Sequence, residues 1–192
     1  MSGADRPRAV VDCDIIYSRV LHDLMGRVAA RLELLQLVWS QELLAEAKQT
    51  LMQRKGLAAD AAQRWVDYLT ASFPDGETDI TQALRSTELR SLSEDPDDLH
   101  VCALAIASSS RYLFTHDRGY LRERLNRRGI EVTEPDTFLT AALEDQPQAM
   151  LELLELQAST WAGGRPVAEL LDALERARTG VFANTARHLL SG

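Results

Sequence analysis

The chain has 192 residues, 45% of them hydrophobic and 26% charged, with a formal net charge of −8. This composition is that of a globular protein rather than an intrinsically disordered one, and the length suits one compact domain with an extension. Two cysteines are too few for a disulfide framework or a zinc pattern. No apolar run reaches the length needed to span a membrane, and residues 1–8 lack the apolar core of a signal peptide. We therefore expect a cytoplasmic protein.

Hydrophobic patterning predicts strands alternating with helices over the first two thirds of the chain. The expected strands cover residues 9–11, 34–39, 112–115 and 130–132. The expected helices cover about 15–31, 41–54, 60–71 and 99–108, with a further basic helix between Asp117 and Gly129. Ser40 is the expected N-cap of the second helix, Gly56 its end, and Asp95 the N-cap before the fourth. This alternation predicts an α/β fold with a short parallel central sheet in three layers, α/β/α.

From Phe138 onward the pattern is purely helical, with helices expected at about 140–161, 166–178 and 181–190. We expect residues 9–139 to form one domain and residues 140–192 a helical C-terminal extension. The extension is not basic, which argues against a second nucleic-acid module.

Four acidic side chains lie at or near the ends of predicted elements: Asp12, Glu46, Asp98 and Asp117. Asp12 and Asp117 follow strands, and Asp98 opens a helix, so all three belong to the carboxyl edge of the sheet. Glu46 lies on the flank of its helix's apolar stripe and can lean into a cleft. Asp98, Glu46 and Asp117 each have a structural explanation when taken alone, such as a favourable charge at a helix N-terminus. Asp12 is harder to explain in this way, because a carboxylate that ends a buried strand is costly without a partner. The prediction of a site rests on the four together.

Carboxylates that point at one place raise each other's pKa, and bound cations relieve that repulsion. A set of oxygen ligands without thiols favours Mg²⁺ or Mn²⁺. These ions activate water and stabilise charge during phosphodiester cleavage. The residues therefore predict a metal-dependent nuclease.

An acidic net charge is unusual for a protein that binds nucleic acid. A local basic cluster offsets it, formed by Arg118, Arg122, Arg124, Arg127 and Arg128. Arg118, Arg122 and Arg124 are the candidates for contacts with the RNA backbone. The alternative is a solvated helix face.

Several stretches closely resemble the PIN-domain family: Val10–Asp14, Ser40–Glu46, Asp95–Val101, Thr115–Asp117 and the terminal Pro135–Leu139. The resemblance covers about residues 9–139. Within the family, the chain is similar to VapC-type toxins of bacterial type II toxin–antitoxin systems. Its helical tail resembles an extension found in one VapC subgroup.

This resemblance implies a PIN-like fold and an endoribonuclease that uses Mg²⁺ or Mn²⁺ and inhibits translation or growth. It also implies a cognate antitoxin that blocks the active site, and homodimers are common among such proteins. By position, Asp12 is the first acid and main metal ligand, Glu46 the second, Asp98 rather than Asp97 the third, and Asp117 the fourth. Asp97 and Thr115 take supporting positions.

The sequence departs from the family pattern at two positions. Asp14 stands where many members have asparagine, and it either adds a ligand or hydrogen-bonds to the loop. Gly119 stands where many members carry a further aspartate, which weakens the last part of the metal site. Among neighbouring residues, we expect Cys13 to point into the core, His100 to be packed or at the surface, and His116 to be exposed.

Two other readings remain open at this point. Asp12-Cys13-Asp14 after an apolar strand superficially fits the nucleophile motif of haloacid-dehalogenase-type phosphatases, which also use Mg²⁺. However, Ile15-Ile16-Tyr17 and the paired acids after Pro96 do not match the rest of that pattern. The other reading is a degenerate, non-catalytic PIN fold that serves as a binding protein, although all four acids are retained.

Overall fold

The computed structural model describes residues 6–191. Residues 1–5, which contribute to the expectation about a signal peptide, lie outside this range, as does residue 192. The contacts divide the chain into two units, and each is described separately. Unit 1 comprises residues 1–17 and 35–132, and unit 2 comprises residues 18–34 and 133–192. The predicted boundary at residue 139 stays a prediction.

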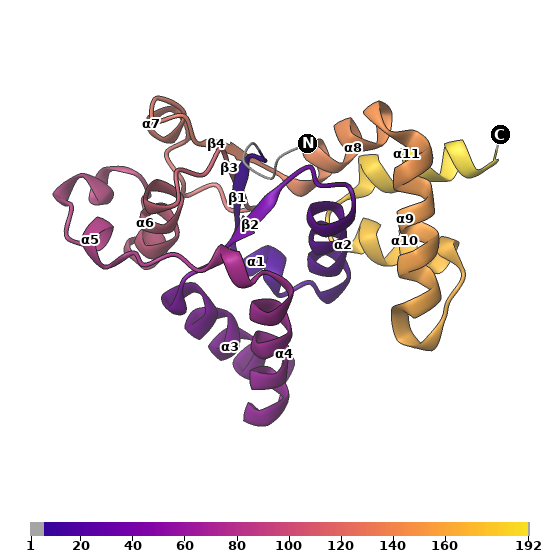
Figure 1. The fold of residues 1–192 in the computed structure, drawn as a ribbon, viewed down its shortest axis with the longest axis horizontal. Coiled ribbons are helices and arrows are strands. Elements are labelled where there is room, and N and C mark those ends of the chain that lie inside the picture. Colours follow the sequence, from indigo (N-terminus) through magenta and orange to yellow (C-terminus); the bar gives the residue numbers. More distant parts are fainter. Residues whose placement is uncertain (1–5, 192) are drawn as a thin grey trace. The chain divides into compact units, whose positions relative to one another are not determined.

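The centre of unit 1 is a four-stranded sheet in the order β2-β1-β3-β4 (Figure 1). Its strands are β1 (Arg8–Val11), β2 (Gln36–Val38), β3 (Tyr112–Phe114) and β4 (Glu131–Thr133). β1 pairs in parallel with both β2 and β3, with Val10 opposite Val38 on one side and Leu113 on the other. The parallel α/β sheet predicted from the sequence is thus confirmed. Because the strands are parallel, β1 and β3 end at the same edge of the sheet.

Six helices of unit 1 connect or flank the strands in the described part of the chain. They are α1 (Cys13–Ile16), α3 (Gln41–Lys55), α4 (Ala59–Ser72), α5 (Thr81–Leu84), α6 (Leu99–Ala107) and α7 (Arg122–Asn126). Short 3-10 turns cover Pro74–Gly76, Thr87–Ser91 and Pro96–Asp98. α3 and α4 pack against each other (Figure 1), and α6 is almost wholly buried between its ends.

Helix α3 matches its prediction closely, and it places Glu46. The Ser40 hydroxyl accepts a hydrogen bond from Leu43 N at 3.3 Å, and Gly56 ends the helix at φ 64°. This left-handed conformation suits glycine, which has no Cβ to clash with the backbone. The stripe of Leu43, Leu44, Ala47 and Leu51 is buried. Glu46, on the flank of that stripe, is half-buried.

Two predicted helices are shorter than the sequence pattern suggested. The helix expected over 15–31 is broken after α1, since Ser18 adopts an extended conformation before α2 (Arg19–Arg31) begins. The basic helix expected after Asp117 is reduced to α7. Residues 119–121 are held by backbone hydrogen bonds to residues 92–94, and this long-range pairing overrides local helix propensity.

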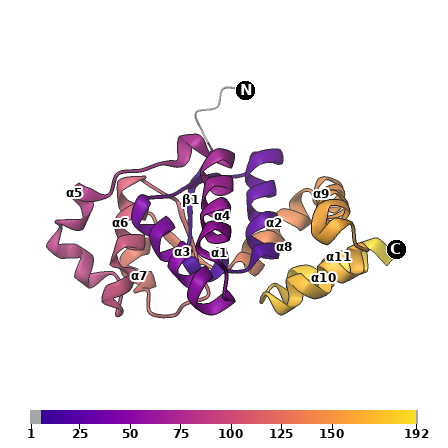
Figure 2. The ribbon, with the colours of Figure 1, turned by 90° about the horizontal axis from the view of Figure 1, so that it is seen from below.

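Unit 2 is helical, and it consists of α2, α8 (Pro135–Asp145), α9 (Pro147–Thr160), α10 (Val167–Arg176) and α11 (Gly180–Ser191). Figure 2 shows α9, α10 and α11 grouped together. The single helix expected over 140–161 is wrong. Pro147 starts a new helix there, because proline cannot donate the backbone hydrogen bond that would continue α8. No helix within residues 6–191 has the length and apolar character needed to cross a membrane.

Candidate functional site

Asp12 is buried at the carboxyl end of β1, where its backbone N–H donates to Phe114 O at 3.0 Å. Its Oδ1 accepts a hydrogen bond from Cys13 N at 2.7 Å. Its Oδ2 accepts two more, from the Thr115 hydroxyl at 2.8 Å and the Tyr120 hydroxyl at 2.9 Å. Burial, reinforced by the charge of Asp14, outweighs these donors and raises the pKa of Asp12 to about 6.

Asp98 is the second acid whose carboxylate is electrostatically unfavourable. It lies half-buried at the start of α6, and its Oδ2 accepts a hydrogen bond from the Ser93 hydroxyl at 3.2 Å. Burial raises its pKa to about 7, and the charges of Asp12 and Asp117 act in the same direction. The charges of both acids that follow strands, Asp12 and Asp117, therefore act on the Asp98 carboxyl.

Asp117 is exposed in the loop after β3, and two hydrogen bonds, one from its backbone and one to its side chain, fix its position. Asp117 N donates to the Thr115 hydroxyl at 2.9 Å, and Asp117 Oδ1 accepts from Gly119 N at 2.7 Å. A Cβ added at Gly119 would lie 3.3 Å from Asp117 Oδ1 and 3.8 Å from Asp98 Oδ2. Two carboxylates from different elements thus border the same small space. Thr115 connects this loop to Asp12, because its hydroxyl also reaches that carboxylate.

Glu46 lies at the margin of this group and contacts His100 on α6. Its Oε2 is 2.9 Å from His100 Nε2, while His100 Nδ1 is 2.7 Å from Asp97 O. The contact with His100 lowers the pKa of Glu46. Burial lowers the pKa of His100, but Glu46, the Asp97 carbonyl and Asp12 together outweigh it and raise that pKa. The charges of Glu46 and Asp12 both favour the protonated form of His100, so the His100 ring interacts electrostatically with both acids.

Asp14 acts on Asp12 through its charge, whereas its hydrogen bonds are with His116. Asp14 Oδ2 accepts a hydrogen bond from His116 N at 2.8 Å and lies 3.2 Å from the ring Nδ1. Of the two roles predicted for Asp14, the structure shows the hydrogen bond to the loop. The expectation that His116 is exposed is wrong, because the contacts with Asp14 hold it inward and leave it 7% exposed.

The remaining predicted residues lie as follows. Asp97 is exposed, and its backbone carbonyl rather than its carboxylate contacts His100. Cys13 is buried as expected, with its thiol 3.7 Å from Leu43 O. Burial, followed by the charge of Glu46, raises the pKa of Cys13, so the thiol stays protonated and is not an anionic ligand.

Sequence reasoning missed two residues at the site, Ser93 and Tyr120. Both are buried, and each donates its hydroxyl to one of the acids. Neither stands out in the sequence, since serine and tyrosine are common near turns and in cores. Their role depends on the pairing of Ser93 with Tyr120, 27 residues further along the chain, which no local sequence pattern indicates.

Two of the three arginines proposed for RNA contacts are held by the protein backbone. Arg122 donates to Val132 O at 2.7 Å, and Arg124 donates to Ser91 O at 3.0 Å. Arg118 is exposed beside Asp117. Arg118 is therefore the arginine of the three best placed to meet a ligand at the acids.

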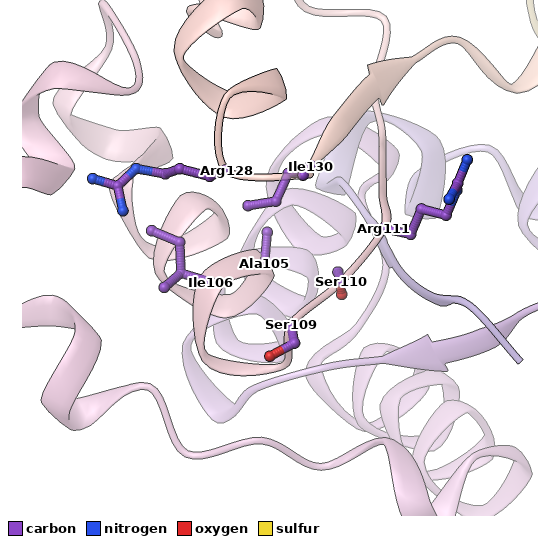
Figure 3. Close-up of a pocket in the computed structure, with 8 residues that line it drawn as sticks. Ala105, Ile106, Ser109, Ser110, Arg111, Arg128 and Ile130 are labelled. Carbon is purple, nitrogen blue, oxygen red and sulfur yellow. The ribbon is translucent and has the colours of Figure 1, made fainter. Parts of the chain in front are cut away.

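A hollow of about 340 Å³ lies at the other end of β3 (Figure 3). It is lined by the end of α6, the residues before β3 and the turn at Gly129. The side chains of Arg111 and Arg128 point away from each other there, and Arg128 forms an ion pair with Glu88. None of the four acids lines this hollow, so it is not part of the candidate site.

Within residues 6–191, no three His, Cys, Asp or Glu side chains lie so that they could hold a metal ion together. The residues present nevertheless fit a divalent cation that prefers oxygen ligands. The donors are carboxylates, and Asp12 and Asp98 have raised pKa values that a cation would reverse. Glu46 Oε2 is buried against the His100 ring, and Gly119 leaves space between Asp98 and Asp117. The acids lie near one edge of the sheet, but among the described residues no three of their carboxylates converge on one cation position.

Comparison with known families gives one match. A family model described as a PIN domain matches residues 8–119, more than half of the chain, and this stretch contains all four acids. Comparisons with curated proteins and with solved structures gave no match.

Proposed function

Because this chain belongs to the PIN domain family, whose members are typically metal-dependent nucleases, we propose that it is an endoribonuclease dependent on Mg²⁺ or Mn²⁺. One observation carries the proposal. Asp98 has a pKa raised to about 7 by burial and by the charges of Asp12 and Asp117. The charges of Asp12 and Asp117 both act on the Asp98 carboxyl, so three carboxylates lie near one another at one sheet edge, and a divalent cation stabilises such a group.

In this proposal, Asp12, Asp98 and Asp117 hold the cation, and Glu46 completes the site from α3. A bound Mg²⁺ or Mn²⁺ supplies an activated water and stabilises charge on the attacked phosphate. The chain's own residues keep the ligands in place. Thr115 holds the Asp12 carboxylate and the Asp117 backbone together, since its hydroxyl bonds to both.

We further propose that the protein is the toxin of a VapC-type toxin–antitoxin pair, acting in the cytoplasm and held inactive by a cognate antitoxin. The stretches around the four acids and the helical tail support this assignment by their resemblance to that group. Growth arrest on expression without the antitoxin, abolished by Asp12→Asn, would test it. Normal growth despite soluble, active nuclease would contradict the toxin assignment and leave the nuclease assignment intact.

Cleavage of labelled RNA by the purified protein tests the nuclease assignment directly. We expect cleavage with Mn²⁺, none with a chelator, and a loss of at least about a hundredfold in Asp98→Asn, because one charged ligand is worth several kcal/mol in the transition state. Asp60→Asn is the control, since Asp60 is exposed on α4 and pairs with Arg64. Intact RNA under all metal conditions would contradict the proposal. Hydrolysis of a chromogenic phosphate ester instead would favour the phosphatase reading.

Arg118 is proposed to contact the RNA backbone next to the acids. Arg118→Glu should raise KM for RNA and lower the salt dependence of binding by about one unit of slope, because one phosphate contact is lost. Arg64→Glu, on the exposed surface of α4, is the matched charge reversal. Equal effects in the two variants would remove Arg118 from the interface and indicate a general charge effect.

A further inference from the structure

Two segments far apart in the sequence meet in a short antiparallel bridge beside the acids. Ser93 pairs with Tyr120. Leu121 N donates to Leu92 O, and Glu94 N donates to Gly119 O, both at 2.9 Å. Ser93 is 6% and Tyr120 2% exposed. The bridge therefore fixes both side chains from a paired and buried backbone.

Each partner of the bridge donates its hydroxyl to a different acid. Tyr120 donates to Asp12 Oδ2 at 2.9 Å, and Ser93 lies 3.2 Å from Asp98 Oδ2. The Ser93 hydroxyl also lies 3.4 Å from Gly119 O, but it has a single proton. The carboxylate is closer, and a charge-assisted hydrogen bond is the stronger one. One structural feature thus orients the first and the third acid.

The hydrogen bonds also determine which oxygen of Asp12 remains available. Oδ2 accepts from both Thr115 and Tyr120, and a carboxylate oxygen has about two acceptor positions. Oδ1 accepts from Cys13 N and therefore retains one acceptor position. Burial raises the pKa of Tyr120, so this hydroxyl keeps its proton and continues to donate.

We propose that the Ser93–Tyr120 bridge is an orienting clamp for the metal-binding carboxylates, in which Tyr120 directs Asp12 Oδ1 toward the cation and Ser93 fixes the Asp98 carboxylate. The inference rests on the proposed metal-dependent function and adds two positioning residues to it. Neither residue contacts the reacting atoms. Their effect is on the affinity for the cation, because groups that hydrogen-bond to a metal ligand fix its orientation.

Mn²⁺ binding to the full chain, followed by electron paramagnetic resonance of the free ion, tests the clamp without any catalytic readout. We expect Tyr120→Phe and Ser93→Ala each to weaken Mn²⁺ binding about tenfold, and the double variant about a hundredfold. Tyr120→Phe keeps the ring and Ser93→Ala removes one atom, so both should retain a cooperative thermal transition. Saturating Mn²⁺ should restore most of the cleavage rate, since the loss lies in metal affinity.

Two control variants remove hydroxyls elsewhere in unit 1. Ser108→Ala removes a buried hydroxyl that donates to Leu104 O near the end of α6, and Tyr112→Phe removes one that accepts from Arg111. Both should bind Mn²⁺ as the wild type does, even where their unfolding temperature falls. This comparison separates orientation of the ligands from a general loss of stability.

The outcomes distinguish the clamp from the function on which it rests. If the wild type binds Mn²⁺ and both Tyr120→Phe and Ser93→Ala bind it equally well, the clamp is wrong and the metal site stands. If the wild type binds no Mn²⁺, the proposed function itself fails. If one variant does not fold, the affinity of the other decides.

Discussion

At the scale of single residues, burial makes the charged forms of Asp12 and Asp98 unfavourable in free energy. Burial raises the pKa of Asp12 to about 6 and that of Asp98 to about 7, from an ordinary value of 3.8. Between the ordinary and the raised pKa values, the folded protein binds more protons than the unfolded chain. The contribution of these groups to the free energy of unfolding therefore falls as the pH rises. Buried His22, whose pKa is lowered to about 4, acts in the opposite direction.

A comparison of the metal-free wild type with Asp98→Asn isolates this effect from that of His22. The amide of the variant does not ionise. Its free energy of unfolding relative to the wild type should therefore increase steadily from about pH 4 to pH 7. Denaturant unfolding with a chelator present, at several pH values, measures the difference. A difference that is constant with pH would mean that Asp98 ionises normally and that the acids do not interact.

The sequence predicted the acids at the site, whereas the hydrogen bonds that hold them were largely missed. Asp12, Asp98 and Asp117 are identifiable because each stands at the end of a local pattern, which fixes its place at the sheet edge. Tyr120 and Ser93 have no such pattern. His116 was expected to be exposed because it adjoins Asp117, but its contacts with Asp14 leave it buried.

At the scale of elements, β2 is fixed by the turn at Pro74–Gly76. Trp39 N donates to Gly76 O at 2.9 Å, and Thr78 N donates to Trp39 O at 2.9 Å. A Cβ at Gly76 would lie 2.5 Å from Leu37 O and 3.0 Å from the Trp39 ring. The backbone itself is the obstacle, and only glycine allows the close approach that holds this turn against β2.

Gly76→Ala should therefore destabilise the protein by about 2–3 kcal/mol, since the strand and the turn must separate to admit the methyl group. Gly180→Ala is the control, because its nearest contact would be at 3.9 Å, and it should change stability by less than about 0.5 kcal/mol. Chemical denaturation measures both. Equal free energies of unfolding for the two variants would show that the turn at Pro74–Gly76 can move away from β2 at little cost.

Elements with local signals were predicted well, and those set by distant contacts were not. The limits of α3 follow from Ser40 and Gly56, whose capping is a local property. The shortness of α7 follows from the bridge at Tyr120, whose partner Ser93 lies 27 positions earlier in the sequence. The break before α9 did have a local signal, Pro147, which the periodic apolar pattern obscured.

At the scale of the whole molecule, the chain forms two units, and the smaller includes residues 18–34 with the C-terminal helices. Gln157 on α9 donates to Val20 O on α2 at 2.9 Å, across 137 residues of sequence. The sequence predicted that this part of the chain is helical, but neither the break at Pro147 nor the association of the C-terminal helices with α2. Contacts between elements so far apart depend on packing, which the pattern of a single chain does not reveal.

The central claim is that Asp12, Asp98 and Asp117 jointly hold a divalent cation at the carboxyl edge of the sheet. The most direct measurement is an anomalous difference map from a crystal soaked in Mn²⁺. We predict a peak within about 2.5 Å of carboxylate oxygens from at least two of these residues, including Asp12. The same carboxylates without a peak between them, in a crystal with Mn²⁺ bound elsewhere on the chain, would contradict the claim.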